Sequence, residues 1–503
     1  MAMPEKKLRL ISKGRYTDGI KCEKLLWYKM NDKSVFPPTD AATQLLFAQG
    51  HEVGRLAHKL YKDAIEIEWE ADAERLTERS RKALLTGKTL FEAGFALEGT
   101  YSIADVLKPV DGKKGVYDLT EVKMGGHIKD YYYDDIAFQK FNYEKNGIKI
   151  NNCYLKIVNA AYVYEGGEID VKKFFQPDIN VNDEVENRQA EVEKNVEKFH
   201  KMIAKSTPPK ISLSENCTDD EHKCPLVDEC WKVVPKGSTL TLYRKYWDQR
   251  FDLFNKQGKK LILDIPKHEL KNKKHEIMHD ALSTKKPVIN KEEIREFIKG
   301  LNYPLYFLDF ETFMNVAVPK FKDSRPYQML PFQFSLHIQE EEGGKAEPHM
   351  YLAPDDNDPR PEILAGLKKL LGDKGDILAF NAHSTEKRII RETCEVFPEY
   401  KKWFAKIEPR IKDLKAPFSG FDYYHHEQEG SASLKDVYPA MTGKSYKDLK
   451  ISEGGDASAK FIKVTYGKVS EKERAEVRAA LEEYCEQDTR AMVEILEKLR
   501  GII

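Results

Sequence analysis

The chain has 503 residues, too many for one hydrophobic core, so we expect roughly two to four domains. Apolar residues make up 41% of the sequence, as in globular proteins, and no apolar stretch reaches the ~18 residues that a membrane span needs. The formal net charge of −1 provides no global field for a polyanionic partner, so any nucleic-acid site must come from local basic patches.

The start of the chain indicates where the protein acts. Residues 1–15 are charged and lack the apolar core of a signal peptide, so we expect a cytoplasmic protein with no membrane partner. The chain also contains 7 cysteines. In a cytoplasmic protein, cysteines serve as ligands or core residues rather than as disulfides.

The first half of the chain alternates between helical and strand-like patterns. Helices are predicted for residues 15–65, 130–147 and 180–205, and strands for 88–125 and 154–164. The same alternation returns from residue 303 onward. The sequence therefore predicts an α/β architecture in both halves.

Two carboxylates and a lysine lie on neighbouring predicted strands of the first half. Asp105 ends one strand, and the i and i+2 spacing of Glu121 and Lys123 points both side chains to one face of the next. The carboxylates suit a divalent metal, and the ammonium suits charge developing on a phosphate or an attacking hydroxide. The helix downstream adds Gln139 and Tyr143.

This order of residues resembles the RecB-like clade of PD-(D/E)xK nucleases, whose signature includes a Gln-x3-Tyr helix and an upstream histidine. The resemblance covers about residues 8–250. It implies a role for each residue: Mg²⁺ or Mn²⁺ binding by Asp105 and Glu121, stabilisation of the hydroxide by Lys123, and positioning of the substrate strand by Gln139 and Tyr143.

The upstream histidine of that signature maps best to His58, with His51 as the weaker choice. In this position His58 would be a further metal ligand. The alternative is an ordinary histidine on a helix surface.

Four cysteines bracket the same region. Cys217, Cys224 and Cys230 lie in a polar, turn-rich segment that offers no core for three thiols, and Cys22 lies near the N-terminus. This pattern resembles the iron–sulfur members of the clade, the AddB-type nucleases and the CRISPR-adaptation nuclease, where a [4Fe–4S] cluster staples the ends of the domain. Tetrahedral zinc is the alternative, but its usual Cys-x2-Cys knuckles are missing, so we favour the cluster. The remaining cysteines are predicted core residues: Cys153, Cys394 and Cys485.

Two further features have competing interpretations. The lysines between Lys256 and Lys274 suit either a solvated linker helix or a contact with a phosphate backbone. The run Tyr131-Tyr132-Tyr133 suits either core packing or stacking on unpaired bases. His337, on a predicted strand, is expected to be structural.

The second half carries a separate set of acidic residues. Asp309 and Glu311 follow an apolar run and share one face of a predicted strand. Tyr484 and Asp488 are four residues apart and share one face of a predicted helix. Clustered carboxylates are what hard divalent cations need, and a two-metal phosphodiesterase also needs a group that positions the attacking water.

This set resembles the DEDDy subclass of the DnaQ-like 3′–5′ exonucleases, over roughly residues 300–503. The resemblance implies that Asp309, Glu311, Glu386 and Asp488 hold two metal ions and that Tyr484 orients the water. Glu386 stands where the family usually has Asp, one residue further from the preceding Asn381. The stretch Ser431 to Val437 also resembles the family's Ser-Leu-Lys segment.

We therefore expect three regions: a PD-(D/E)xK restriction-endonuclease-like domain with an iron–sulfur staple over 1–250, a Lys-rich helical linker over 251–298, and an RNase H-like (DnaQ) exonuclease domain over 299–503. The expected function is Mg²⁺- or Mn²⁺-dependent hydrolysis of DNA, exonucleolytic on single strands or ends. The alternatives are an RNA-processing nuclease and a nucleic-acid-binding subunit in which one site, that of Glu386, is degenerate. The layout also resembles a bacterial and archaeal family of unknown function, so no biological role comes with it.

Overall fold

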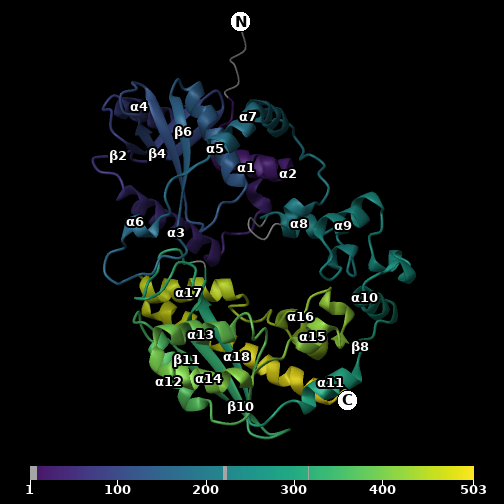
Figure 1. Ribbon diagram of the computed structural model, residues 1–503. Helices are drawn as coiled ribbons and strands as arrows, with labels where there is room; N and C mark the ends of the chain where they lie inside the picture. Colours follow the sequence, from purple (N-terminus) through teal and green to yellow (C-terminus); the bar gives the residue numbers. More distant parts are fainter. Residues whose placement is uncertain (1–7, 219–223, 315) are drawn as a thin grey trace. The chain divides into compact units, whose positions relative to one another are not determined.

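Figure 1 shows a computed structural model of the chain, which describes residues 8–218, 224–314 and 316–503. The expected mixed α/β fold is confirmed, and the chain divides into two compact units. Unit 1 comprises Met1–Thr39, Gln44–Glu229 and Val316–Tyr327, and unit 2 comprises Asp40–Thr43, Cys230–Asn315 and Gln328–Ile503. Within the described ranges, every helix is too short or too polar to cross a lipid bilayer.

A seven-stranded mixed sheet forms the centre of unit 1. The hydrogen-bonded order is β2-β3-β4-β5-β6-β7, and β1 pairs in parallel with the start of β4. The strands are β1 (Ile11–Ser12), β2 (Ile65–Glu66), β3 (Leu90–Leu97), β4 (Thr100–Pro109), β5 (Val116–Lys123), β6 (Lys149–Ile157) and β7 (Ile179–Asn180). Because β5 pairs only with the second half of β4, from Val106 to Pro109, the first half of β4 is free to accept β1.

Helix α5 (Tyr131–Lys145) is the helix most deeply buried against this sheet, since nine of its 15 residues are buried. Its apolar side chains join those of β3, β4 and β6 in the main hydrophobic core of unit 1. Helices α1, α2 and α7 extend this core on the outer side of α5. The other helices of unit 1 are α1 (Lys13–Lys21), α2 (Glu23–Asn31), α3 (Ala41–His58), α4 (Ala73–Leu84), α6 (Val171–Phe174) and α7 (Asn182–Ile203).

The segment Val316–Tyr327 lies between two strands of unit 2 in sequence but packs into unit 1. The amide of Asp323 donates to the carbonyl of Tyr164 at 2.7 Å, and the amide of Ala317 donates to Oε1 of Gln49 at 3.0 Å. Apolar side chains of the segment join a second hydrophobic cluster with residues of α3 and α6. The sequence did not predict this exchange.

Residues 251–298, expected as a linker, are packed within unit 2. Ile262, Ile265 and Met278 join Phe421 and Tyr424 in one hydrophobic cluster. The elements here are α10 (Lys273–Thr284), β8 (Val288–Ile289) and α11 (Lys291–Lys299), and β8 pairs with β14 (Tyr423–Tyr424). Helices α8 (Val227–Trp231) and α9 (Trp247–Phe251) come earlier in the chain. The apolar residues between the lysines therefore build a core.

A five-stranded mixed sheet forms the centre of unit 2, with β9 in the middle. Its order is β11 (Ala346–Leu352), β10 (Leu330–Gln339), β9 (Leu305–Phe313), β12 (Asp376–Ala379) and β13 (Ile411–Asp413). The pairs β11–β10 and β10–β9 are antiparallel, whereas β9, β12 and β13 run parallel. The carboxyl ends of these three parallel strands therefore lie at one edge of the sheet.

Helices cover both faces of this sheet. Tyr306, Leu308 and Phe310 of β9 point into a core with α12 (Arg360–Leu370), α13 (Glu386–Val396) and α14 (Lys401–Ile407). The alternation of strand side chains then turns Asp309 and Glu311 toward the opposite face. That face packs against α17 (Gly454–Tyr466) and the long α18 (Glu471–Arg500, yellow in Figure 1). Helix α16 (Leu434–Thr442) packs against α18, and α15 (Ala416–Gly420) follows β13 in sequence.

Candidate functional site

In unit 1 the structure brings the predicted carboxylates Asp105 and Glu121 together. They lie on the antiparallel pair β4 and β5, where Val106 is opposite Thr120. The amide of Val122 donates to Oδ2 of Asp105 at 2.6 Å, which fixes that carboxylate against β5. The first carboxylate of the pair is thus held by the neighbouring strand itself.

Glu121 is the most heavily bonded member of this group. Its side chain is 2% exposed and contacts Lys123 Nζ at 2.7 Å. Nε2 of Gln139, from α5, donates to its Oε2 at 2.7 Å. Nζ of Lys13, from the first turn of α1, donates to both carboxylate oxygens at 2.7 and 2.9 Å and lies 4.0 Å from Asp105. Sequence reasoning missed Lys13, because only the pairing of β1 with β4 places it here.

Two more acidic residues complete the surroundings of Lys123 and Lys13. Asp135 on α5 forms an ion pair with Lys123, whose ammonium also lies 5.0 Å from the centre of the Tyr132 ring. Glu92 lies on β3 with a φ of 56°, where the pairing of β3 with β4 skips one residue. Neither residue was predicted, since nothing in the sequence marks a strand irregularity at Glu92.

The charges of this group oppose one another. Burial, followed by the charge of Glu121, raises the pKa of Asp105 to about 7. Burial also acts to raise the pKa of Glu121, but the ammonium groups of Lys123 and Lys13 bring it down to about 2. Burial raises the pKa of Glu92 as well. The lysines thus outweigh burial at Glu121, whereas burial and the charge of Glu121 outweigh the effect of Lys13 and Lys123 at Asp105.

Tyr143 and His58 lie in different surroundings. Tyr143 is completely buried, and its hydroxyl accepts from the amide of Ala104 at 2.8 Å and donates to the carbonyl of Ala93. The structure therefore places Tyr143 as a link between β3 and β4. The ring of His58 stacks on Phe91 with centroids 3.9 Å apart, and its Nδ1 lies 3.8 Å from Glu66. These contacts do not join His58 to Asp105 or Glu121, so its role as a ligand stays a prediction.

The three consecutive tyrosines at the start of α5 belong to the core. Tyr132 is buried, and Tyr131 and Tyr133 pack against the main hydrophobic cluster. The Arg188 guanidinium also lies 4.9 Å from the centre of the Tyr133 ring. These contacts favour core packing over stacking on bases.

Cysteines from the two ends of unit 1 lie close together. Burial, and then the charges of Cys217 and Cys22, raise the pKa of the Cys224 thiol. The side-chain amide of Asn216 donates to the carbonyl of Lys21 at 3.0 Å, which ties the two chain segments together. Cys230 lies on α8, just after the last residue of unit 1.

The donor set of these cysteines can be compared with both candidate groups. None of the four forms a disulfide. Four thiolates suit either an iron–sulfur cluster or one tetrahedral zinc ion, so the identity of the group stays a prediction.

In unit 2 the structure gathers four predicted carboxylates from three elements. Asp309 and Glu311 lie on β9, Asp488 on α18, and Glu386 at the start of α13. Burial and three neighbouring carboxylates raise the pKa of Asp309 well above its ordinary value: those of Asp488, Glu386 and Glu311. Burial and Asp488 likewise raise the pKa of Glu311. These side chains are therefore close enough to repel one another.

Glu386 joins this group from the edge where the parallel strands end. Burial and the charge of Asp413, the last residue of β13, raise the pKa of Glu386 to about 8. Asp413 itself accepts hydrogen bonds from the amides of Asn381 and Lys415, both at 2.9 Å. Glu386 is 2% exposed, and its Oε2 has no hydrogen-bond partner among the described residues. Asp413 is a residue that sequence reasoning missed.

The face of α18 that bears Asp488 also bears Tyr484 and Cys485. Burial, followed by the charges of Asp488, Glu311 and Asp309, raises the pKa of Tyr484 far above its ordinary value. A ligand atom of each of Asp309, Glu311 and Cys485 lies within 4.8 Å of the other two. Cys485 is buried, as predicted, but it lies beside the carboxylates.

Two residues outside the predicted set also face this group. The Lys435 ammonium lies 5.4 Å from the centre of the Tyr484 ring and 3.0 Å from Glu453, and its charge lowers the pKa of Glu311 and Asp488. Tyr446 is buried, and its interaction with Asp488 lowers the pKa of that carboxyl. Lys435 belongs to the Ser-Leu-Lys stretch, so the sequence contained a signal for it.

His337 has a structural position in this unit. It is buried on β10, and its Nδ1 lies 2.9 Å from Oγ1 of Thr489 on α18. The same hydroxyl lies 2.7 Å from Oγ of Ser335. These polar contacts fix α18 against β10 beside the acidic residues.

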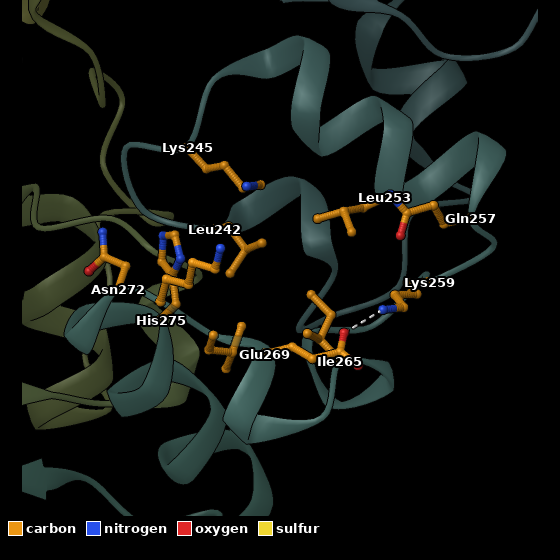
Figure 2. A pocket seen from close by; sticks show the side chains of 11 residues that line it. Leu242, Lys245, Leu253, Gln257, Lys259, Ile265, Glu269, Asn272 and His275 are labelled. Atoms are coloured by element: carbon orange, nitrogen blue, oxygen red, sulfur yellow. Dashed lines mark hydrogen bonds and ion pairs between the residues drawn. The ribbon is translucent and has the colours of Figure 1, made fainter.

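Figure 2 shows a pocket of about 450 Å³ in the Lys-rich part of unit 2. Several of its polar groups already have partners: Lys259 contacts Glu269 at 2.9 Å, and Nε2 of His275 lies 2.8 Å from the carbonyl oxygen of Tyr243. Several other lysines of this stretch are paired with acidic residues: Lys256 with Asp252, Lys267 with Asp280, and Lys273 with Glu276. These pairs favour a packed structural segment over a phosphate-binding track.

Residues 306–433 match the family model described as a domain of unknown function, DUF2779. The matched segment contains Asp309, Glu311 and Glu386 and ends before Tyr484 and Asp488. No curated protein matches the chain. The match thus covers the sheet of unit 2 and assigns no chemistry to it.

Proposed function

We propose that this protein is a metal-dependent nuclease that hydrolyses phosphodiester bonds of DNA, acting on single strands or ends. The observation that carries the proposal is the group of four buried carboxylates in unit 2: Asp309, Glu311, Glu386 and Asp488. Like charges gathered in a buried site are costly unless they are neutralised. Among the described residues, the Lys435 ammonium is the cation that lowers the pKa of Glu311 and Asp488.

The donor set fits Mg²⁺ or Mn²⁺. Hard divalent cations prefer carboxylate oxygens, and the unpartnered Oε2 of Glu386 is such an oxygen. When bound, these ions activate water and neutralise charge on a phosphate. Tyr484 would orient the attacking water through its hydroxyl, and the high pKa of that group keeps the proton in place. Lys435 would add a positive charge beside Tyr484.

The group in unit 1 supports a second site of the PD-(D/E)xK type. Asp105 and Glu121 would hold one divalent ion, and the Lys123 ammonium would stabilise an attacking hydroxide. Gln139 is completely buried, and its Oε1 has no hydrogen-bond partner among the described residues, so it is available to a metal-bound water. The proposed roles of Asp105 and Glu121 do not depend on His58.

The cysteines support a [4Fe–4S] cluster held by Cys22, Cys217, Cys224 and Cys230. The proximity of Cys22 to Cys217 and Cys224 means that such a cluster would join the start of unit 1 to its end. In this proposal the cluster has a structural role, since four thiolate ligands leave no open position.

The test uses end-labelled single-stranded DNA and RNA of the same sequence, incubated with Mn²⁺ and resolved as product ladders. The proposal expects a DNA ladder that Asp309→Ala reduces strongly and that EDTA abolishes. The matched control is Lys472→Ala, because Lys472 is an exposed residue of α18. Arg360→Lys would not serve as a control, because Arg360 is buried. A ladder with RNA alone would replace DNA by RNA as the substrate, and no hydrolysis of either strand would leave only a binding function.

A further inference from the structure

Lys13 holds a position between the two carboxylates of the unit 1 site. Its Nζ is within 2.7 and 2.9 Å of the two oxygens of Glu121 and 4.0 Å from Oδ1 of Asp105. The Lys13 ammonium thus contacts both oxygens of one carboxylate and faces a second carboxylate. These are the oxygens that a divalent cation would bind at this site. The side chain remains 25% exposed, so it is not locked in the core.

The backbone around Lys13 fixes this arrangement. Ser12 pairs with Tyr101 of β4, and its Oγ accepts from the amide of Arg15 as the N-cap of α1. Lys13 is therefore the first residue of a helix that begins directly beside the strand bearing Asp105. Lys123 contacts the same Oε1 of Glu121 from the other side and is also engaged by Asp135. Glu121 thus has two cationic partners before any metal arrives.

We propose that the Lys13 ammonium is a built-in cation of the unit 1 site, which occupies the metal-facing oxygens of Glu121, so that a divalent ion binds there only by displacing it. This inference rests on the proposed metal site at Asp105 and Glu121. It distinguishes the two units, because Lys435, the lysine beside the unit 2 carboxylates, pairs with Glu453 and forms no ion pair with those carboxylates among the described residues.

The experiment measures Mn²⁺ binding by the full chain, using the electron paramagnetic resonance signal of the free ion. Asp309→Asn and Asp488→Asn are combined first to remove binding in unit 2. In this background, Lys13→Met should tighten Mn²⁺ binding by about tenfold or more, because a competing charge is lost. Lys13→Arg keeps the charge and should leave the affinity near that of the background.

A matched control is available within the same unit. Lys29 donates to both oxygens of Asp18 at 2.8 and 2.7 Å, so Lys29→Met breaks an equivalent ion pair away from the site. It should leave Mn²⁺ affinity unchanged. Equal or weaker binding by Lys13→Met would overturn the inference and would instead favour Lys13 as a contact for the phosphate of the substrate.

Two further outcomes are separated by the design. If Asp105→Asn changes no Mn²⁺ binding in this background, the metal site of unit 1 is itself absent and the proposed function fails there. If Lys13→Met is unfolded in EDTA, the inference requires that Mn²⁺ restores the circular dichroism spectrum, because the ion would take the place of the ammonium. Failure of Mn²⁺ to restore the fold would count against it.

Discussion

The Asp488 carboxylate on α18 raises the pKa of Asp309 on β9 more than any other charged neighbour does. A helix and a strand that are distant in sequence therefore contribute to one electrostatic unit. The repulsion between them is relieved by protons at low pH and, in our proposal, by divalent cations at neutral pH. This relationship makes the unit 2 site testable without an activity assay.

Asp309→Asn should stabilise the metal-free protein. Above about pH 8, where Glu386 is also ionised, removing one of the four buried carboxylates lowers the repulsion. A gain of ~1 kcal/mol corresponds to a midpoint increase of roughly 2–4 °C for a domain of this size. Differential scanning calorimetry in EDTA measures the change for the transition of unit 2. The same variant should lose most of the stabilisation that Mn²⁺ gives to wild type. An equal metal response in both proteins would argue against Asp309 as a ligand.

The stability of unit 2 should fall as the pH rises from about 4 to about 8 in EDTA. The folded-state pKa is raised to about 6 for Asp488 and to about 8 for Glu386, from ordinary values of 3.8 and 4.5. Between these values the folded state binds more protons than the unfolded state, so each rise in pH favours unfolding. Urea titrations at pH 5, 6.5 and 8 check the slope, and Mn²⁺ should reduce it. A flat profile in EDTA would mean that the carboxylates do not interact as the structure implies.

Glu386→Asp tests the third ligand. The side chain reaches the group from the start of α13, one residue further from Asn381 than the exonuclease pattern has it, so a shorter side chain should withdraw the carboxylate from Asp309. We expect Mn²⁺ affinity and DNA hydrolysis both to fall by at least about tenfold. Glu392→Asp, on the same helix at a position where Glu392 pairs with Arg388 and Gln328, is the matched control. Unchanged activity in Glu386→Asp would remove Glu386 from the site.

Tyr484→Phe should cost less than loss of a metal ligand. The variant loses a hydroxyl that orients water in our proposal but keeps all four carboxylates. A rate decrease of about ten- to a hundredfold is therefore expected, with unchanged Mn²⁺ affinity. Asp309→Ala should lower the rate by roughly a thousandfold or more, and adding Asp488→Ala should lower it little further, because groups that act together are not additive. Additive losses would indicate independent roles.

If the proposed iron–sulfur cluster is present, anaerobically purified protein should be brown, with a broad absorbance near ~400 nm. Cys22→Ser should remove most of the iron and destabilise unit 1. In our proposal the Cys22 thiol is the one ligand from the start of the unit, and the other three ligands come from residues 217–230. Cys153→Ala changes a buried thiol of the same unit and should retain the iron. Elemental analysis that finds stoichiometric zinc and no iron would replace the cluster with a zinc site.

Local patterns were sufficient to predict the strand of Asp309 and Glu311 and the helix of Tyr484 and Asp488. Each pair is close in sequence, so its shared face follows from the periodicity of one element. Lys13 was not predictable in this way, because its contact with Glu121 depends on the two-residue pairing of β1 with β4. Whether these residues catalyse hydrolysis stays a prediction.

The residues around Lys123 show a second limit of local reasoning. Its partner Asp135 lies on α5, and only the packing of that helix against the sheet brings the two charges together. Glu386 shows the opposite case, because a family pattern indicated the residue and the structure places it beside Asp309. Short patterns therefore find charged residues that are close in sequence, whereas long-range packing decides which distant charges join them, as it does for Lys13 and Asp135.

The segment Val316–Tyr327 constrains how this protein can be divided. The chain leaves unit 2 after β9, contributes to the core of unit 1, and returns at β10. A fragment that ends at residue 229 would lack that contribution, and the complementary fragment would carry it with nothing to pack against. Gene truncations between the halves should therefore yield insoluble products, and the two units are expected to be inherited together rather than exchanged as separate modules.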